Sequence, residues 1–217
     1  MIIIHKKRIK IIISCILIAV FAFSFQIASN QTKNKPIEQK SQEQNTIATT
    51  ATPVSGKTIV IDARSSACQM NGAQSSNGTT EAQTNLKIAL KLQNLLETSG
   101  STVILTRSDE NAIYDLNSTT LKQKKISDIH NRVKIGNESS ADIFVSIHLN
   151  KIPQGEYWGW QCFYKNGDEK STNLAKQIQS NLNDAIQKEN KRVAMKLDTV
   201  YIMKHVEIPI SIVECGF

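Results

Sequence analysis

The sequence predicts an α/β fold, with a single domain built on a twisted, mostly parallel sheet and helices on both faces. Short apolar runs rich in Val, Ile and Phe alternate along the chain with longer segments whose apolar residues recur at helical spacing. Such alternation favours parallel strands, because each helix returns the chain to the same end of the sheet. The pattern begins near Lys57 and leaves about 160 residues, enough to bury one hydrophobic core.

The order of these segments predicts the individual elements. Strands are expected at residues 58–61, 101–106, 141–148, 161–164 and 208–214, with 161–164 at an edge of the sheet. Helices are expected at residues 81–99, 127–138 and 171–189. The first of these helices should end at Gly100, because glycine is the preferred residue after a helix C-terminus. Residues 107–126 are polar and are expected to form a loop.

The segment before this domain predicts export. Four basic residues and no acidic ones precede an apolar run at residues 11–28, which indicates either a signal peptide or a membrane anchor at residues 1–28. Residues 29–56 are rich in Gln, Asn, Thr, Ser and Lys, and we expect a disordered linker there because such a segment buries too little apolar surface. Residues 57–217 would then lie outside the cytoplasm, either secreted or held at the membrane.

Charge and cysteine content exclude two further classes of protein. The formal net charge is +7, but it falls to +3 without residues 1–28, which contain four of the 26 basic residues and none of the 19 acidic ones. No stripe of basic and aromatic residues suggests nucleic-acid binding. Cys68, Cys162 and Cys215 follow the export segment without metal-type spacing, so a disulfide framework is not expected, although one pair could form.

Three residues at element ends point to a metal site. His148 ends an apolar strand and is followed by Asn150, Glu214 ends another strand, and Glu81 begins a helix. The carboxyl ends of parallel strands meet at one edge of the sheet, where ligands bind in such folds. A hydrolytic zinc site needs three protein donors, an open position for water and a nearby carboxylate. Each residue also has a purely structural interpretation: a buried histidine, a salt-bridge glutamate, and a carboxylate favoured by the helix dipole.

Several ordered motifs resemble the zinc-dependent N-acetylmuramoyl-L-alanine amidases (amidase type 3), and in particular the germination-specific branch of spore-forming bacteria. The resemblance covers about residues 57–217. It rests on Thr80–Leu86, Leu105–Arg107, Asn131–Arg132, Ser146–Asn150, Tyr201–His205 and Val213–Phe217.

This resemblance implies hydrolysis of the amide between N-acetylmuramic acid and L-alanine of the stem peptide in peptidoglycan. It implies that Glu81 and His148 are two of three Zn²⁺ ligands and that Glu214 is the proton-transfer residue. His205 and Asn150 are weaker candidates for substrate contact. The germination-specific branch acts in the spore cortex, where removal of the peptide allows muramic-δ-lactam to form. The partners expected are peptidoglycan, a membrane at the N-terminal segment and an activating lipoprotein.

Other polar and aromatic residues have less specific interpretations. Arg107 and Arg132 are expected to hold the fold rather than to touch substrate, and His205 could simply be solvated beside Lys204. The tryptophans at positions 158 and 160 could line a glycan groove or pack in the core.

The chain departs from the family pattern at two places. The family's first zinc histidine lies in an Asp-x-Gly-His-Gly motif, whereas Asp62–Ala73 contains no histidine and is one residue longer. Arg64-Ser65 can be encoded AGG-TCA, which read one base later contains the start of Gly-His codons, so an altered reading frame and genuine divergence both account for the change. The family also continues past its Glu-x-Gly-Phe motif, so we expect a catalytic domain truncated at its C-terminus.

Two functions therefore follow from the sequence. The first is an exported zinc amidase, impaired to the extent that the missing histidine weakens metal binding. The second is a non-catalytic protein that keeps the amidase fold and binds peptidoglycan or a partner. Cys68 or Ser65 could supply a third metal donor only if the altered loop placed it there.

Overall fold

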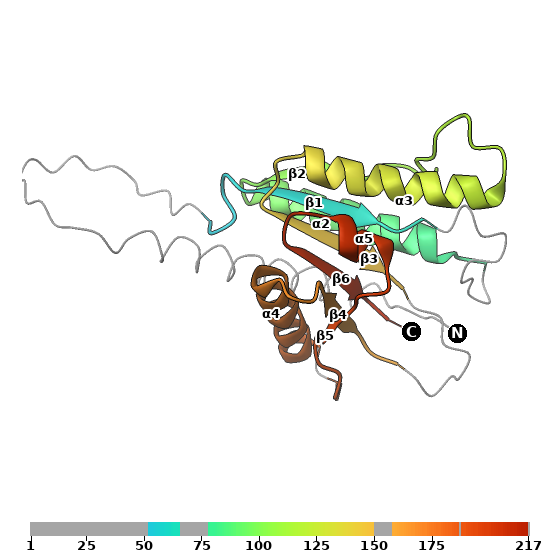
Figure 1. Cartoon of the computed structure of the whole chain (residues 1–217). Helices are drawn as coiled ribbons and strands as arrows, with labels where there is room; N and C mark the ends of the chain where they lie inside the picture. Colours follow the sequence, from blue (N-terminus) through green and yellow to red (C-terminus); the bar gives the residue numbers. More distant parts are fainter. Residues whose placement is uncertain (1–51, 66–77, 150–157, 187, 217) are drawn as a thin grey trace, which may run out of the picture.

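The computed structural model describes residues 52–65, 78–149, 158–186 and 188–216, and these form an α/β domain around a six-stranded sheet (Figure 1). The strand order is β2-β1-β3-β6-β4-β5. The strands are β1 (Thr58–Ala63), β2 (Thr102–Leu105), β3 (Ile143–His148), β4 (Gln161–Tyr164), β5 (Met195–Lys196) and β6 (Ile210–Glu214). The single-domain α/β prediction is confirmed.

The sheet is mostly parallel, as predicted. β2, β1, β3 and β6 run in the same direction, whereas β4 is antiparallel to β6 and parallel to β5. Consequently, β1, β3 and β6 end side by side, and we call this border the carboxyl edge of the sheet. The segment 161–164 was predicted to be the edge strand, but β5 lies outside it. β5 escaped the sequence analysis because it has only two residues, both exposed.

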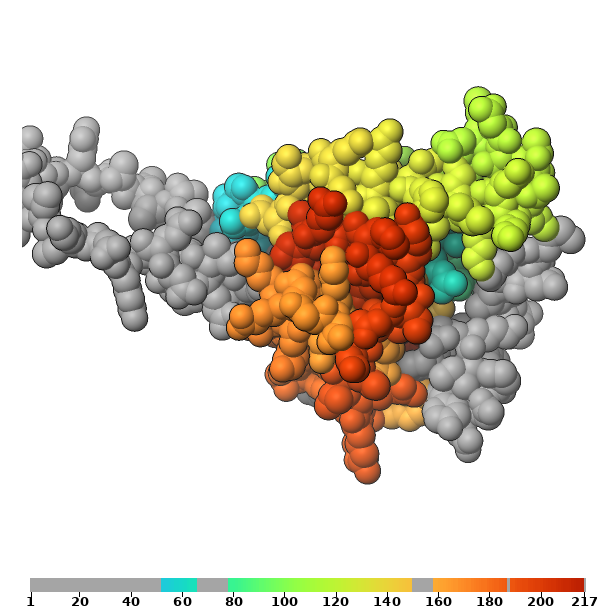
Figure 2. Space-filling model, viewed as in Figure 1, coloured from blue at the N-terminus to red at the C-terminus, as the bar shows by residue number. Residues whose placement is uncertain are grey.

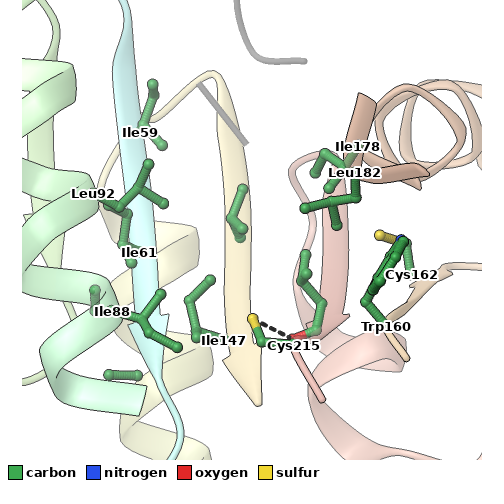
Figure 3. Packing of buried hydrophobic residues seen from close by; sticks show 14 of the residues in the cluster. Ile59, Ile61, Ile88, Leu92, Ile147, Trp160, Cys162, Ile178, Leu182 and Cys215 are labelled. Carbon is green, nitrogen blue, oxygen red and sulfur yellow. Dashed lines mark hydrogen bonds between the residues drawn. The ribbon is translucent and has the colours of Figure 1, made fainter. Parts of the chain in front are cut away.

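Helices cover both faces of the sheet. α2 (Glu81–Thr98) and α4 (Glu169–Ala185) pack on one face, and α3 (Leu121–Glu138) and α5 (Tyr201–His205) pack on the other. Figure 3 shows the first interface, where Ile88 and Leu92 of α2 face Ile59 and Ile61 of β1. On the outer surface, the C-terminal segment that contains α5 lies beside α3 (Figure 2).

Alternation along β1 assigns its side chains to the two faces. Ile59, Ile61 and Ala63 join the core under α2 and α4, whereas Val60 joins the core under α3 and α5. Because side chains alternate across a strand, Asp62 lies on the α3 and α5 face, two positions after Val60. The strands are nearly continuous apolar runs because the sheet is buried on both sides.

Two boundaries differ from the sequence prediction. α3 begins at Leu121, within the segment predicted to be a loop, because Thr120 and Gln123 form a capping box that starts the helix there. The folded region also begins before Lys57. Val54 was assigned to the disordered linker, but its side chain is fully buried in the core. The short helix α5 was not predicted, since its five residues are too few to show a periodic pattern.

The predicted export segment at residues 1–28 and most of the predicted linker lie outside the described residues. Within the described part of the chain, no helix combines the length and apolar character needed to cross a membrane.

Candidate functional site at the carboxyl edge

The carboxyl edge brings three polar side chains into lateral contact across neighbouring strands. Ala63 of β1 pairs with Ile147 of β3, so the next residue, Arg64, lies beside His148. In turn, His148 pairs with Glu214 of β6. The Arg64 backbone N–H continues the ladder by donating to the Ile147 carbonyl. Register alone therefore fixes the order Arg64, His148, Glu214 along the edge.

Glu81 reaches the same edge from the opposite face of the sheet. It is the first residue of α2, which begins with a capping box between Thr80 and Gln83, and a carboxylate is favoured at this end of the helix dipole. Its Oε1 accepts long hydrogen bonds of 3.4 Å from the Leu149 N–H and from Nδ2 of Asn85. The carboxylate is thereby held against the residue that follows His148.

The three residues predicted for the metal site do converge, but a cation from the chain lies among them. Nη1 of Arg64 is 3.4 Å from Nδ1 of His148 and 3.6 Å from Oε1 of Glu81. The same Nδ1 is 3.6 Å from Oε1 of Glu214. The carboxylates and the imidazole are nine-tenths buried, whereas 42% of the Arg64 side chain is exposed.

A hydrogen-bonded chain behind His148 sets the orientation of its ring. Nε2 of His148 lies 3.0 Å from Oγ of Ser146, and this hydroxyl donates to Oδ2 of Asp62 at 2.5 Å. Because the single Ser146 proton goes to the carboxylate, the hydroxyl oxygen must accept from His148. Nε2 of His148 therefore donates to Ser146, and Nδ1 faces Nη1 of Arg64 and Oε1 of Glu214.

Asp62 is ionised because a buried arginine faces it. Burial raises the pKa of the Asp62 carboxyl, but Arg132 and hydrogen bonds from Ser146 and Thr106 outweigh this, so its pKa is lowered. Nη1 of Arg132 is 2.5 Å from Oδ1 of Asp62, and Nε of Arg132 is 2.8 Å from Oδ2 of Asp128. Arg132 thus connects α3 to β1 through Asp62, while Asp128, one turn earlier on α3, holds the guanidinium in place.

The other buried arginine supports the backbone of the edge. Arg107 donates to the carbonyls of Ala63, Arg64, Ala82 and Asp109. Its guanidinium therefore joins the end of β1 to the first turn of α2. Both arginines hold the fold, as the sequence predicted.

A cleft of about 450 Å³ opens at the carboxyl edge, between α3 and the segment around α5. Polar groups at its base include Asp62, Arg64, His148 and Glu214. Its walls are largely apolar and include Ile129, Leu197, Val200, Ile202 and Ile212. A largely apolar cleft with a few convergent polar groups is the usual form of a small-ligand site.

Glu214 has a carboxylate oxygen that is not engaged by another residue of the cleft. Its Oε2 is buried and has no hydrogen-bond partner among the described residues. A buried carboxylate oxygen without a donor is unfavourable by about 1–3 kcal/mol, more for a charged group. A bound water or a substrate N–H would satisfy it.

The expected zinc ion does not fit the described residues as they stand. Glu81 and His148 supply two donors where a hydrolytic zinc needs three, and a guanidinium nitrogen occupies the place where those donors meet. Across the described ranges, no group of three His, Cys, Asp or Glu residues is placed to hold a metal. Cys68 lies outside these ranges.

The remaining sequence-based candidates are Asn150, His205 and the two tryptophans. Asn150 is outside the described residues. His205 is exposed on α5, where its ring stacks on Tyr201 at 3.8 Å between centroids, and it does not line the cleft. Trp160 is buried and donates to Asn183, whereas Trp158 is 46% exposed.

Two of the cysteines also have defined positions. Cys162 and Cys215 are buried and free, and burial raises the pKa of both thiols. Ser146 and Asp62 were missed as the groups behind His148, although Ser146 lies two residues before His148 on the same strand and so on the same face. Asp62 pairs with Ser146 across β1 and β3.

Comparison with known proteins places this chain in a family. Residues 59–217 match the N-acetylmuramoyl-L-alanine amidase family. A germination-specific N-acetylmuramoyl-L-alanine amidase from Bacillus subtilis is 29% identical over 165 residues, which are 76% of this chain and 68% of that protein. The B. subtilis amidase LytC is 30% identical over 167 residues, but only 30% of its length is covered.

Solved structures agree with this assignment. The CwlD amidase from Clostridioides difficile, determined in complex with the GerS lipoprotein, is 40% identical with a TM-score of 0.68, over 74% of this chain and 82% of that one. An N-acetylmuramoyl-L-alanine amidase from C. difficile 630 is 26% identical with a TM-score of 0.61, over 74% and 80% of the two chains. With the family matching most of its length, this chain belongs to the N-acetylmuramoyl-L-alanine amidases.

Proposed function

We propose that this protein acts on the amide that joins N-acetylmuramic acid to L-alanine in peptidoglycan, outside the cytoplasm and within spore cortex maturation. The convergence of Glu81, His148 and Glu214 at the carboxyl edge of an amidase-family domain is the observation that carries this proposal. The germination-specific relative supports the spore cortex as the place of action. Product formation there would precede synthesis of muramic-δ-lactam.

Glu214 is the proposed proton-transfer residue. Its Oε1 lies near His148, and its buried Oε2 has no partner among the described residues, so one oxygen can accept a proton from a bound water. The same carboxyl could then return the proton to the leaving amine, as general acid–base catalysis of amide hydrolysis requires. The position of Glu214 at the base of the cleft supports this role.

Zinc is the proposed cofactor, with Glu81 and His148 as the described residues that would hold it. When bound, zinc supplies a Lewis acid that polarises a carbonyl and acidifies water. These two donors do not complete a site by themselves. The proposal therefore requires a third protein donor from outside the described residues and a displacement of the Arg64 side chain.

The geometry of Arg64 favours a second candidate function, in which the domain binds muramyl peptides or a partner without hydrolysis. A guanidinium between Glu81 and His148 pairs with the Glu81 carboxylate without any metal. The cleft would remain available for ligand. A lipoprotein is the partner proposed for either function, as an activator in the case of hydrolysis, with support from the structure of CwlD bound to GerS.

Metal content and product release distinguish the two functions. The full-length protein would be purified, its bound metal measured by mass spectrometry, and its action on isolated peptidoglycan followed by release of stem peptides. Hydrolysis predicts peptides with a free L-alanine amine and a loss of more than a hundredfold in rate in Glu214→Gln. Glu189→Gln is the matched control, because that side chain is 77% exposed and its carboxylate forms an ion pair with the exposed Lys191.

Binding without metal and without peptide release would instead support the second function. In that case, Glu214→Gln should change affinity for muramyl peptides and leave a metal content near zero in both proteins. Failure to bind peptidoglycan in either form would contradict both functions.

A further inference from the structure

We propose that Arg64 serves as an internal cation in place of a metal ion, so that the buried Glu81 carboxylate is paired without metal and the domain binds zinc only in competition with its own guanidinium. The proposal concerns the resting site and does not depend on whether the protein hydrolyses peptidoglycan. It follows from the position of one atom, Nη1 of Arg64, relative to two donors.

The first step is the coincidence of contacts. The same nitrogen lies 3.6 Å from Oε1 of Glu81 and 3.4 Å from Nδ1 of His148. A metal held by these two residues would have to bind the same carboxylate and the same ring nitrogen. The guanidinium therefore faces the atoms that a metal would use.

The second step is the orientation of the ring. Nε2 of His148 lies 3.0 Å from Oγ of Ser146, and Ser146 donates to Asp62. With Nε2 held in this way, Nδ1 faces Nη1 of Arg64. A ring nitrogen that accepts from an arginine N–H cannot bind a metal at the same time, so Arg64 occupies the face of the ring that a metal would use.

The third step is charge. Glu81 and Glu214 are both largely buried and lie on either side of His148. Unpaired buried carboxylates are strongly unfavourable. The other arginine near this edge, Arg132, already contacts Asp62 and Asp128. Arg64 is the described cation that forms an ion pair with Glu81, so it supplies to this carboxylate the positive charge that a metal would provide, whereas the ion-pair contact of Glu214 among the described residues is with His148.

The fourth step is the support of the Arg64 main chain. The Arg64 N–H donates to the Ile147 carbonyl of β3, and the Arg64 carbonyl accepts from Arg107 and Asn85. The β1–β3 register fixes the main chain of Arg64 beside His148. The side chain itself is 42% exposed and its contacts of 3.4–3.6 Å are long, so a metal ion could displace the guanidinium toward solvent.

The test is Zn²⁺ binding measured by competition with a chromophoric chelator, together with thermal unfolding with and without Zn²⁺, on the full-length protein. Arg64→Gln removes the charge but keeps most of the length, and Arg64→Lys keeps the charge. We expect Arg64→Gln to bind Zn²⁺ at least tenfold more tightly than the wild type and Arg64→Lys to bind it no more tightly. Lys57→Gln is the control, because it removes another half-buried ion pair, with Asp142, at the opposite end of β1.

A double variant assigns the gain to this site. Adding Glu81→Gln to Arg64→Gln should abolish the improved Zn²⁺ binding, since one of the two donors is then lost. Equal Zn²⁺ affinity in the wild type and Arg64→Gln would overturn the proposal, and so would a gain that survives Glu81→Gln.

The stability of the variant gives an independent readout. If Arg64→Gln unfolds more readily than the wild type, Zn²⁺ should restore its melting temperature, because a cation between Glu81 and His148 would again pair with the buried Glu81 carboxylate. A loss of folding that Zn²⁺ does not reverse would contradict the proposal. Absence of amidase activity in every variant would bear on the proposed function and leave this result intact.

Discussion

Replacing Asp62 by asparagine tests the ion pair that supports the back of the site. The contact between Oδ1 of Asp62 and Nη1 of Arg132 measures 2.5 Å, and the two side chains are 2% and 4% exposed. At an effective dielectric constant of about 20, opposite charges about 4 Å apart attract by about 4 kcal/mol. Removing one charge of a buried pair costs roughly 3–5 kcal/mol, because the other is left uncompensated.

We expect Asp62→Asn to lower the free energy of unfolding by about 3 kcal/mol, at the lower end of that range. Arg132 keeps its contacts with Asp128, and the asparagine carbonyl can still accept one hydrogen bond. For a domain of this size, such a loss lowers the melting temperature by roughly 6–12 °C. Urea denaturation followed by circular dichroism measures the free energy, and calorimetry measures the temperature.

A double-mutant cycle with Arg132→Met isolates the pair itself. Coupled residues give non-additive changes, so Asp62→Asn should cost at least about 1.5 kcal/mol less in the Arg132→Met background than in the wild type. Additive effects within about 0.5 kcal/mol would refute the argument that these two charges balance each other. A single-variant loss below about 1 kcal/mol would refute the magnitude.

The remaining predictions concern pH, packing, capping and the hydrogen-bonded chain. The pKa of Asp62 is lowered from 3.8, so its ionised form adds stability above about pH 4 that is lost as pH falls through the lowered value, and acid titration of Asp62→Asn should lack this component. Gly136→Ala should destabilise by about 1–3 kcal/mol in urea despite better helix propensity, because its Cβ would lie 2.8 Å from the buried Phe144 ring; a stabilised variant would contradict this. Thr80→Ala should cost about 1 kcal/mol in the same assay, because it removes the cap of α2; an unchanged midpoint would argue against that cap. Ser146→Ala should cost about 1–3 kcal/mol and shift the ring nitrogen resonances of His148 in NMR spectra, whereas unchanged resonances would show that the hydroxyl does not set the tautomer.

Much of the fold could be predicted from periodicity alone, because the buried strands are continuous apolar runs and the long helices have regular apolar stripes. Where the prediction failed, a local interaction decided the boundary. The capping box at Thr120 and Gln123 starts α3 in a segment whose polar composition suggested a loop. Val54 joins the core from a turn that composition assigned to a linker. β5 and α5 are too short to carry a pattern.

The site was predictable to the extent that it depends on strand ends. His148 and Glu214 meet because parallel strands end at the same edge, and Glu81 reaches them because its helix begins there. What the sequence could not supply is the lateral register of β1 against β3. That register places Arg64 beside His148, and a one-residue shift would put its side chain on the other face.

The side chains that hold the carboxyl edge of the sheet together are not the ones that would bind a metal. Arg107 and Arg132 join β1, α2 and α3 through backbone carbonyls, Asp62 and Asp128, and none of these contacts uses Glu81, His148 or Glu214. Loss of a metal donor therefore need not unfold the domain, provided that the buried Glu81 carboxylate is paired with another positive charge. Arg64 supplies that charge from the position next to His148. Because the cleft does not depend on a metal for its support, metal affinity and ligand binding must be measured separately in this protein.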